Sequence, residues 1–159
     1  DIQLSSGVDK AQIYEELLPQ LEAYFSGEDD FIANMANLSA ILQDAFDFLW
    51  TGFYLWKDSE LVLGPFQGPM ACTRIQSGKG VCGTAFEKQE TIIVPDVDAF
   101  PGHIACSVLS RSEIVLPMIS NGKAIGVLDV DSRELNSFDE VDAKYLNRIL
   151  DLLLNASKN

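Results

Sequence analysis

The sequence predicts an α+β fold, with a central, largely antiparallel sheet that carries the N- and C-terminal helices on one face and ligand-binding loops on the other. Three observations support this fold class. Helical patterns begin and end the chain, while strand patterns occupy its middle. The strand patterns come in pairs joined by two-residue turns, and strands joined in this way are antiparallel. No repeat or long linker divides the chain, so residues 1–159 are expected to form a single domain.

Three long helices are expected. Residues 9–25 and 30–49 place apolar side chains at helical spacing. Pro19 lies within the first of these patterns and is expected to kink or break that helix. A last helix is expected at about 138–156, where Ser137 and the glutamate three residues later make a capping box.

The strands are expected mainly as two hairpins. Aromatic and β-branched runs at 50–57 and 60–66 predict the first hairpin. Runs at 113–120 and 123–131 flank Asn121-Gly122, which is the strongest short-range hairpin signal. Shorter elements are expected between the hairpins: a strand at 70–76, a helix at 81–88, a strand at 91–94 and an irregular loop at 96–112.

Composition excludes several classes of protein. The 11 Lys and Arg residues against 24 Asp and Glu residues give a net charge of −13. This charge argues against binding to nucleic acid or to an anionic membrane surface, since both require a cationic face. No apolar run approaches the roughly 20 residues that span a bilayer. Residues 1–8 lack a starting Met and a signal-peptide pattern, so we expect a cytoplasmic protein with a disordered or foreign N-terminus.

The three cysteines are the most informative residues. An isolated cysteine is most often a small buried hydrophobe, and three are too few for a secreted disulfide scaffold. Cys82 lies at a predicted helix start, where the helix dipole favours a thiolate. Cys106 lies in an irregular loop near His103, the only histidine. A zinc site would join these residues with Cys72, but the spacing matches no compact zinc pattern, so no metal is expected.

Three carboxylates are expected to meet on the sheet. Odd-numbered residues of the strand at 123–131, among them Asp129 and Asp131, are expected to face away from the long helices. Glu113 begins the neighbouring strand and is expected to converge on them. Crowded carboxylates repel one another and lose hydration, which raises their pKa values. Solvent exposure at a strand end or a bound cation would relieve this repulsion, and the pattern leaves both arrangements open.

An aromatic surface is expected beside these acids. Trp50, Tyr54 and Trp56 share one face of their strand, and Gly52 is expected to leave a gap between them. An apolar wall opposite a cluster of acids suits a small ligand with a cationic head and an apolar tail. Packing in the core would explain the aromatic residues almost as well.

Several stretches that contain these residues resemble the free methionine-(R)-sulfoxide reductases, a family of GAF-domain enzymes. The similarity covers essentially the whole chain, and it is specific because most GAF sensor domains lack all three cysteines. It implies a central antiparallel sheet flanked by helices, as the patterns do. The stretches are Leu61–Gly68, Gly80–Ala85, Gly102–Cys106, Ser112–Pro117 and Ile125–Ser132.

The resemblance also implies a mechanism. Cys106 would take the oxygen of free methionine-(R)-sulfoxide, becoming a sulfenic acid and releasing methionine. Cys72 would resolve this acid as a disulfide, which thioredoxin would reduce, with no bound cofactor. Cys82 would be an accessory thiol. Ser107 departs from the family pattern, in which an acidic residue usually follows the attacking cysteine, and Leu109 breaks a run of small residues.

The same resemblance implies how the substrate is held. Glu113, Asp129 and Asp131 would bind its ammonium group and assist protonation of the sulfoxide oxygen. Trp50 and Tyr54 would form aromatic walls around its methyl end.

Two other functions stay open at this stage. One is a GAF module that senses a small molecule, although such a module needs none of the cysteines and is usually joined to an output domain. The other is a thiol redox sensor, whose disulfide regulates a partner instead of completing turnover. The helices at residues 9–49 could also pair with a second copy, which would make a homodimer.

Overall fold

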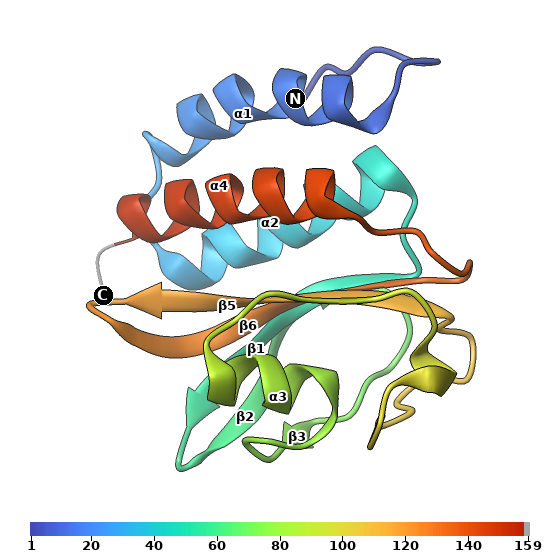
Figure 1. Cartoon of the computed structure of the whole chain (residues 1–159). Coiled ribbons are helices and arrows are strands. Elements are labelled where there is room, and N and C mark those ends of the chain that lie inside the picture. The colour runs from blue at the N-terminus through green and yellow to red at the C-terminus, as the bar shows by residue number, and fades with distance from the viewer. Residues whose placement is uncertain (158–159) are drawn as a thin grey trace.

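The computed structural model describes residues 1–157, and a six-stranded antiparallel sheet lies at its centre (Figure 1). The strand order is β3-β2-β1-β6-β5-β4, so the two long hairpins meet where β1 pairs with β6. The strands are β1 Trp50–Lys57, β2 Glu60–Gln67, β3 Arg74–Ile75, β4 Ile92–Val94, β5 Ser112–Ser120 and β6 Lys123–Ser132.

The helices lie on both faces of this sheet (Figure 1). Helices α2 (Phe31–Phe46) and α4 (Glu140–Ala156) cover one face, and α1 (Lys10–Phe25) packs on them as an outer layer. The short helix α3 (Gly80–Lys88) covers part of the opposite face, where a smaller apolar core forms. A 3-10 turn (Val97–Ala99) lies within the loop before β5. The predicted α+β class, with the long helices on one face, is confirmed.

The three long helices each differ from the expected ones in one respect. Helix α1 continues through Pro19, because buried residues before and after it hold the helix in place, so a break there was wrong. Helix α2 ends at Phe46 instead of residue 49, because Asp47 has a left-handed conformation with φ 54°. Helix α4 is capped by Asp139 in a capping box with Asp142, so Ser137 does not cap it.

A buried polar contact joins α1 to α4. The Tyr14 hydroxyl donates to Asp142 Oδ1 at 2.7 Å, and Lys10 Nζ donates to Asp142 Oδ2 at 2.6 Å. Asp142 is only 2% exposed, so its charge is stabilised by these partners.

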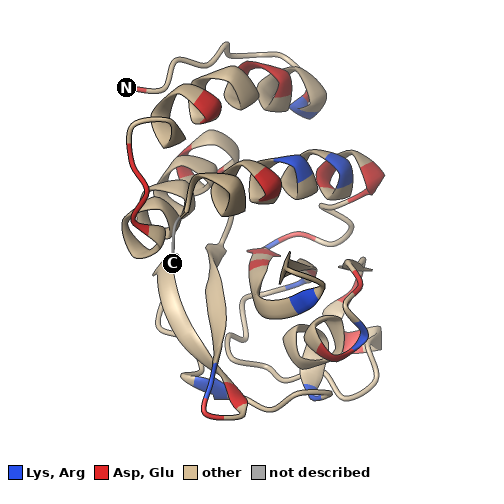
Figure 2. Ribbon diagram, turned by 90° about the vertical axis from the view of Figure 1, so that its left-hand side faces the viewer, with Lys and Arg blue, Asp and Glu red and all other residues tan. Residues whose placement is uncertain are grey.

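Acidic residues elsewhere in the molecule lie along the helices and in turns between strands (Figure 2).

The N-terminal segment packs on α1 rather than lying free. The Gln3 N–H donates to Gln20 Oε1 at 2.8 Å, and the Ser5 N–H donates to Glu16 Oε1 at 2.7 Å. Residues Ile2 and Leu4 pack against the core, contrary to the expectation of disorder over residues 1–8. Within residues 1–157, every helix is too short or too polar to cross a membrane.

The two predicted hairpins are present, and the strands differ from the expected ones in two respects, the length of β3 and the side on which Ile125 lies. The turn has left-handed Asn121 and Gly122, with φ 53° and 78°, as an Asn-Gly hairpin requires. The strand expected at 70–76 is reduced to β3, Arg74–Ile75, and the preceding residues form a loop. On β6, Ile125 packs on the long-helix side, because the β5–β6 register shifts beside it.

Candidate active site

A pocket opens on the face of the sheet opposite the long helices. Its floor is the central part of the sheet, and its walls are the first turn of α3 and the loops before β3 and β5. Every residue that the sequence predicts for the site lines this pocket except Cys72, which is bonded to a lining residue. The lining residues among those predicted are Trp50, Tyr54, Cys82, Cys106, Glu113, Asp129 and Asp131.

The three carboxylates converge because of the pairing of β5 with β6. Glu113 lies directly opposite Asp131 in the register, and Asp129 lies two residues before Asp131 on the same face of β6. Glu113 is 5% exposed and Asp129 is 6% exposed, while Asp131 is half-buried. The alternative in which the acids are exposed to solvent at a strand end is therefore wrong for Glu113 and Asp129.

Burial dominates the electrostatics of this cluster. The loss of hydration raises the pKa of Glu113 well above its usual range, and the charges of Asp129 and Asp131 raise it further. Burial likewise raises the pKa of Asp131, and the charge of Asp129 raises it further. A hydrogen bond from Ser110 lowers it in part. The cluster therefore favours protonation or a cationic partner.

We expect the substrate-free protein to lose stability as the pH rises above about 4.5, the ordinary pKa of glutamate. Below that pH, Glu113 is protonated in both the folded and the unfolded state. Above it, the unfolded state releases the proton while the folded state retains it, so rising pH favours unfolding until the raised pKa is passed. Urea unfolding across this range should give Glu113→Gln an advantage over the parent that grows with pH. A difference that does not change with pH would contradict this expectation.

Two of the cysteines form a disulfide at the pocket. Cys72, in the loop before β3, is bonded to Cys106, in the loop before β5, with their Cα atoms 5.4 Å apart. The pairing implied by the resemblance is thus present in the structure. A zinc site made of all three cysteines and His103 is excluded in this oxidised form, because a disulfide offers no thiolates.

The aromatic residues hold the loop that carries Cys72. The Tyr54 hydroxyl donates to the Cys72 carbonyl at 2.8 Å, and Trp50 Nε1 donates to the Pro69 carbonyl at 3.0 Å. Each aromatic residue therefore has an apolar ring in the pocket wall and a polar group bonded to the loop. Tyrosine and tryptophan that are buried usually find such partners, but the identity of the partner could not be predicted from the sequence.

The gap expected at Gly52 is closed. The Trp50 ring lies over this glycine, and a Cβ atom there would be 2.7 Å from Trp50 Cη2 and 2.3 Å from Phe66 Cβ. The rings of Trp50 and Phe66 stack with centroids 5.2 Å apart, and Trp50 also stacks on Tyr54. Glycine is thus required here so that the aromatic wall can close, and it does not leave space for a ligand.

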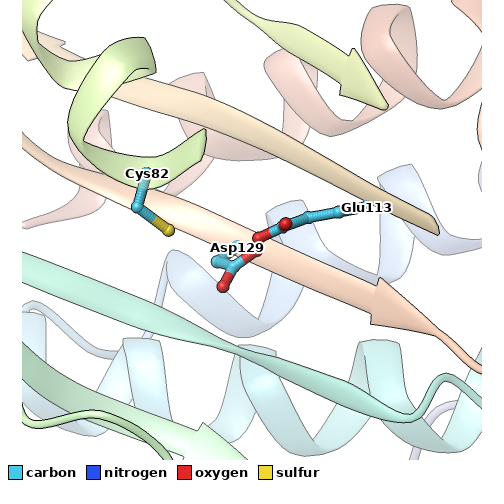
Figure 3. A group of neighbouring side chains, drawn as sticks. All are labelled: Cys82, Glu113 and Asp129. Atoms are coloured by element: carbon cyan, nitrogen blue, oxygen red, sulfur yellow. The ribbon is translucent and has the colours of Figure 1, made fainter. Parts of the chain in front are cut away.

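Cys82 is buried in the first turn of α3, where it faces the acids. Figure 3 shows its sulfur turned towards the carboxylates of Asp129 and Glu113. Burial raises the pKa of the Cys82 thiol well above its usual range, and the neighbouring carboxylates raise it further. The expectation that the helix dipole favours a thiolate here was therefore wrong, since lost hydration and negative charge outweigh the dipole.

Two polar residues of the loop before β5 complete the site. His103 Nε2 lies 3.8 Å from Glu113 Oε1, so the loop that carries Cys106 reaches the acids. The Ser110 hydroxyl donates to Asp131 Oδ1 at 2.9 Å and orients that carboxylate. Nothing in the sequence pattern indicated Ser110. Ser107 lines the pocket, and its hydroxyl accepts a hydrogen bond from the Leu109 N–H at 3.2 Å.

The fold and the pocket together define a GAF domain with a disulfide beside its ligand site. A family model described as GAF domain matches residues 35–156. A GAF domain-containing protein A from Dictyostelium discoideum is 60% identical, with 98% of each chain covered. A free methionine-R-sulfoxide reductase from Saccharomyces cerevisiae is 45% identical over 96% of this chain and 89% of that protein.

A solved structure of a free methionine-R-sulfoxide reductase is also similar to this chain. It is the free methionine-R-sulfoxide reductase of Neisseria meningitidis in complex with its substrate, and it is 53% identical with a TM-score of 0.94. The alignment covers 98% of this chain and 95% of that chain. The present chain belongs to the free methionine-(R)-sulfoxide reductase family, whose members are oxidoreductases built on a GAF domain.

Proposed function

We propose that this protein reduces free methionine-(R)-sulfoxide to methionine through a sulfenic acid and an intramolecular disulfide. The observation that carries the proposal is the Cys72–Cys106 disulfide at the edge of a pocket with buried carboxylates. A disulfide in this position is the product expected after one turnover. Relatives that share about half of its residues are named for this activity.

The chemistry balances in three steps. The sulfoxide oxygen passes to the Cys106 thiol, which becomes a sulfenic acid as methionine is released. The Cys72 thiol then attacks the sulfenic sulfur, and the disulfide forms as water leaves. Thioredoxin supplies two electrons and two protons as a dithiol, and becomes a disulfide itself. The reaction needs no bound cofactor, because the external dithiol is the reductant.

The acids serve both binding and proton transfer. Glu113, Asp129 and Asp131 would surround the substrate ammonium, whose charge offsets their mutual repulsion. A sulfoxide oxygen leaves easily only when it is protonated, so an acid with a raised pKa is suited to donate the proton. Trp50 and Tyr54 provide the apolar wall for the methyl end, since both line the pocket.

Cys82 has an accessory part in this scheme. Its thiol is buried and faces Asp129 and Glu113, which keep it protonated at neutral pH. A protonated thiol is a poor nucleophile, so it would line the ammonium site rather than attack the substrate. The proposed reduction of the disulfide by thioredoxin would suit the cytoplasm, where thioredoxin keeps thiols reduced. Dimerisation through the N-terminal helices stays a prediction.

Coupled turnover tests the proposed function directly. Oxidation of NADPH is followed with thioredoxin, thioredoxin reductase and either epimer of free methionine sulfoxide. We expect steady turnover with the R epimer and none above background with the S epimer. A single burst of about one turnover per protein, without steady turnover, would instead indicate a thiol redox sensor. Binding of the substrate without any methionine release would indicate a sensing module.

A further inference from the structure

We propose that Cys82, Glu113 and Asp129 form a binding site for a thiophilic divalent metal ion such as Zn²⁺, and that the metal competes with the substrate for this pocket. The three side chains come from α3, β5 and β6, and all of them are buried. Figure 3 shows the sulfur and the two carboxylates turned towards a common point.

The separation of the donor atoms suits one small cation. The Cys82 sulfur and one oxygen from each carboxylate all lie within 4.8 Å of one another. A point between three such atoms lies at most about 2.8 Å from each, close to the roughly 2.0–2.3 Å of zinc–ligand bonds. Small side-chain rotations would therefore complete the coordination. Within residues 1–157, no other trio of such ligand atoms comes this close together.

A second observation points independently to a cationic ligand. Asp129 is 6% exposed, and its Oδ1 has no hydrogen-bond partner although the atom is fully buried. A buried acceptor without a partner is costly, and a bound cation would satisfy it. A cysteine sulfur and two carboxylate oxygens are all atoms that bind zinc, and water can take the fourth position around three protein ligands.

The donor types also indicate which metals fit. Magnesium and calcium prefer oxygen ligands in larger numbers, so a site with a cysteine selects against them. Zinc and its neighbours among the transition metals accept thiolate, imidazole and carboxylate together. On binding, the metal displaces the thiol proton and any carboxyl proton into solvent, and its two positive charges replace the repulsion within the cluster.

Occupation of the site by a metal would inhibit the proposed reaction. Two of its three ligands, Glu113 and Asp129, are those proposed above to hold the substrate ammonium. The metal and the substrate therefore cannot occupy the cluster together. Binding at this site would therefore lower activity when free zinc rises.

The test uses the oxidised protein, in which Cys82 is the only free cysteine. Cobalt replaces zinc as the probe, because a cobalt–thiolate bond gives an intense charge-transfer absorption that oxygen and nitrogen ligands lack. We expect this absorption on titration with cobalt, and its loss when zinc is added. Cys82→Ser should remove it, and Asp129→Asn should weaken cobalt binding by more than about tenfold, since losing even a partner of a ligand costs about 10–100-fold.

A matched control keeps the test specific. Glu90→Gln removes an exposed carboxylate outside the pocket, and it should titrate like the parent. Circular dichroism and thermal unfolding should show that Cys82→Ser and Asp129→Asn are folded. Absence of the charge-transfer absorption in the parent, or its persistence in Cys82→Ser, would overturn the proposal. Adding free methionine-(R)-sulfoxide should raise the apparent dissociation constant of cobalt; an unchanged constant would overturn the competition.

Discussion

Replacing Cys106 with serine is expected to lower turnover of free methionine-(R)-sulfoxide by at least about 10³-fold, as removal of catalytic nucleophiles does. A serine hydroxyl cannot take the sulfoxide oxygen, because its oxygen is not oxidised as a thiol sulfur is when it becomes a sulfenic acid. The loop before β5 should keep its place, since its contacts with the acids through His103 and Ser110 do not involve the sulfur. The coupled NADPH assay measures this loss.

Replacing Cys72 with serine separates the two thiols. This variant should release about one methionine per protein in a single-turnover experiment, because Cys106 is still present, but it should not recycle through a disulfide with Cys72. Chromatography of methionine after mixing reduced protein with substrate measures the first step alone. Substantial single turnover by Cys106→Ser, or normal steady turnover by Cys72→Ser, would contradict the assigned roles.

The fold was predictable largely because its signals are local. Alternating side chains and the Asn121-Gly122 turn predict the hairpin of β5 and β6, but the register that starts at the turn would place Val130 opposite Glu113. The shift between Met118 and Ile119 brings Asp131 opposite Glu113 instead. The alternation of side chains thus placed the acids on one face, whereas their exact pairing depends on a bulge that the pattern does not show. Where a boundary depended on tertiary contacts, the pattern failed: α1 continues through Pro19 because its buried residues hold it in place.

The site was less predictable, since its loops have no periodicity. No spacing rule predicts the Cys72–Cys106 pairing across 34 residues, and only the resemblance implied it. The contact of Ser110 with Asp131 depends on how the loop closes. The state of Cys82 was predicted wrongly for a physical reason. A helix start is visible in a sequence, whereas the buried acids around the thiol are not.

The buried acids also imply a balance between stability and binding. Asp129 has an unpartnered buried oxygen, so the empty pocket carries a free-energy cost that a cationic ligand removes. We therefore expect Asp129→Asn to be at least as stable as the parent without substrate. Such a cost in the free protein is typical of a site arranged for a charged ligand, because the same groups that weaken the empty fold strengthen the complex.

The second large effect is expected from the same residue in catalysis. Asp129→Asn should lower kcat/KM for free methionine-(R)-sulfoxide by roughly 10²- to 10³-fold, because removing one partner of a buried ion pair costs about 3–5 kcal/mol. The parent should use N-acetylated methionine-(R)-sulfoxide poorly for the same reason, since its amide brings no charge to the buried acids.

Comparing both substrates with both proteins makes this prediction specific to the ammonium group. Asp129→Asn should lose far more activity with the free amino acid than with the acetylated one. The ratio of kcat/KM for the free substrate to that for the acetylated substrate should therefore be smaller in the variant than in the parent. Asp96→Asn, which changes an acid outside the pocket lining, is the matched control and should keep the preference. Equal losses on the two substrates would show that Asp129 acts on the sulfoxide rather than on the ammonium. In that case the charge of the substrate would have to be bound by Glu113 and Asp131 alone, because these are the other two acids that line the pocket.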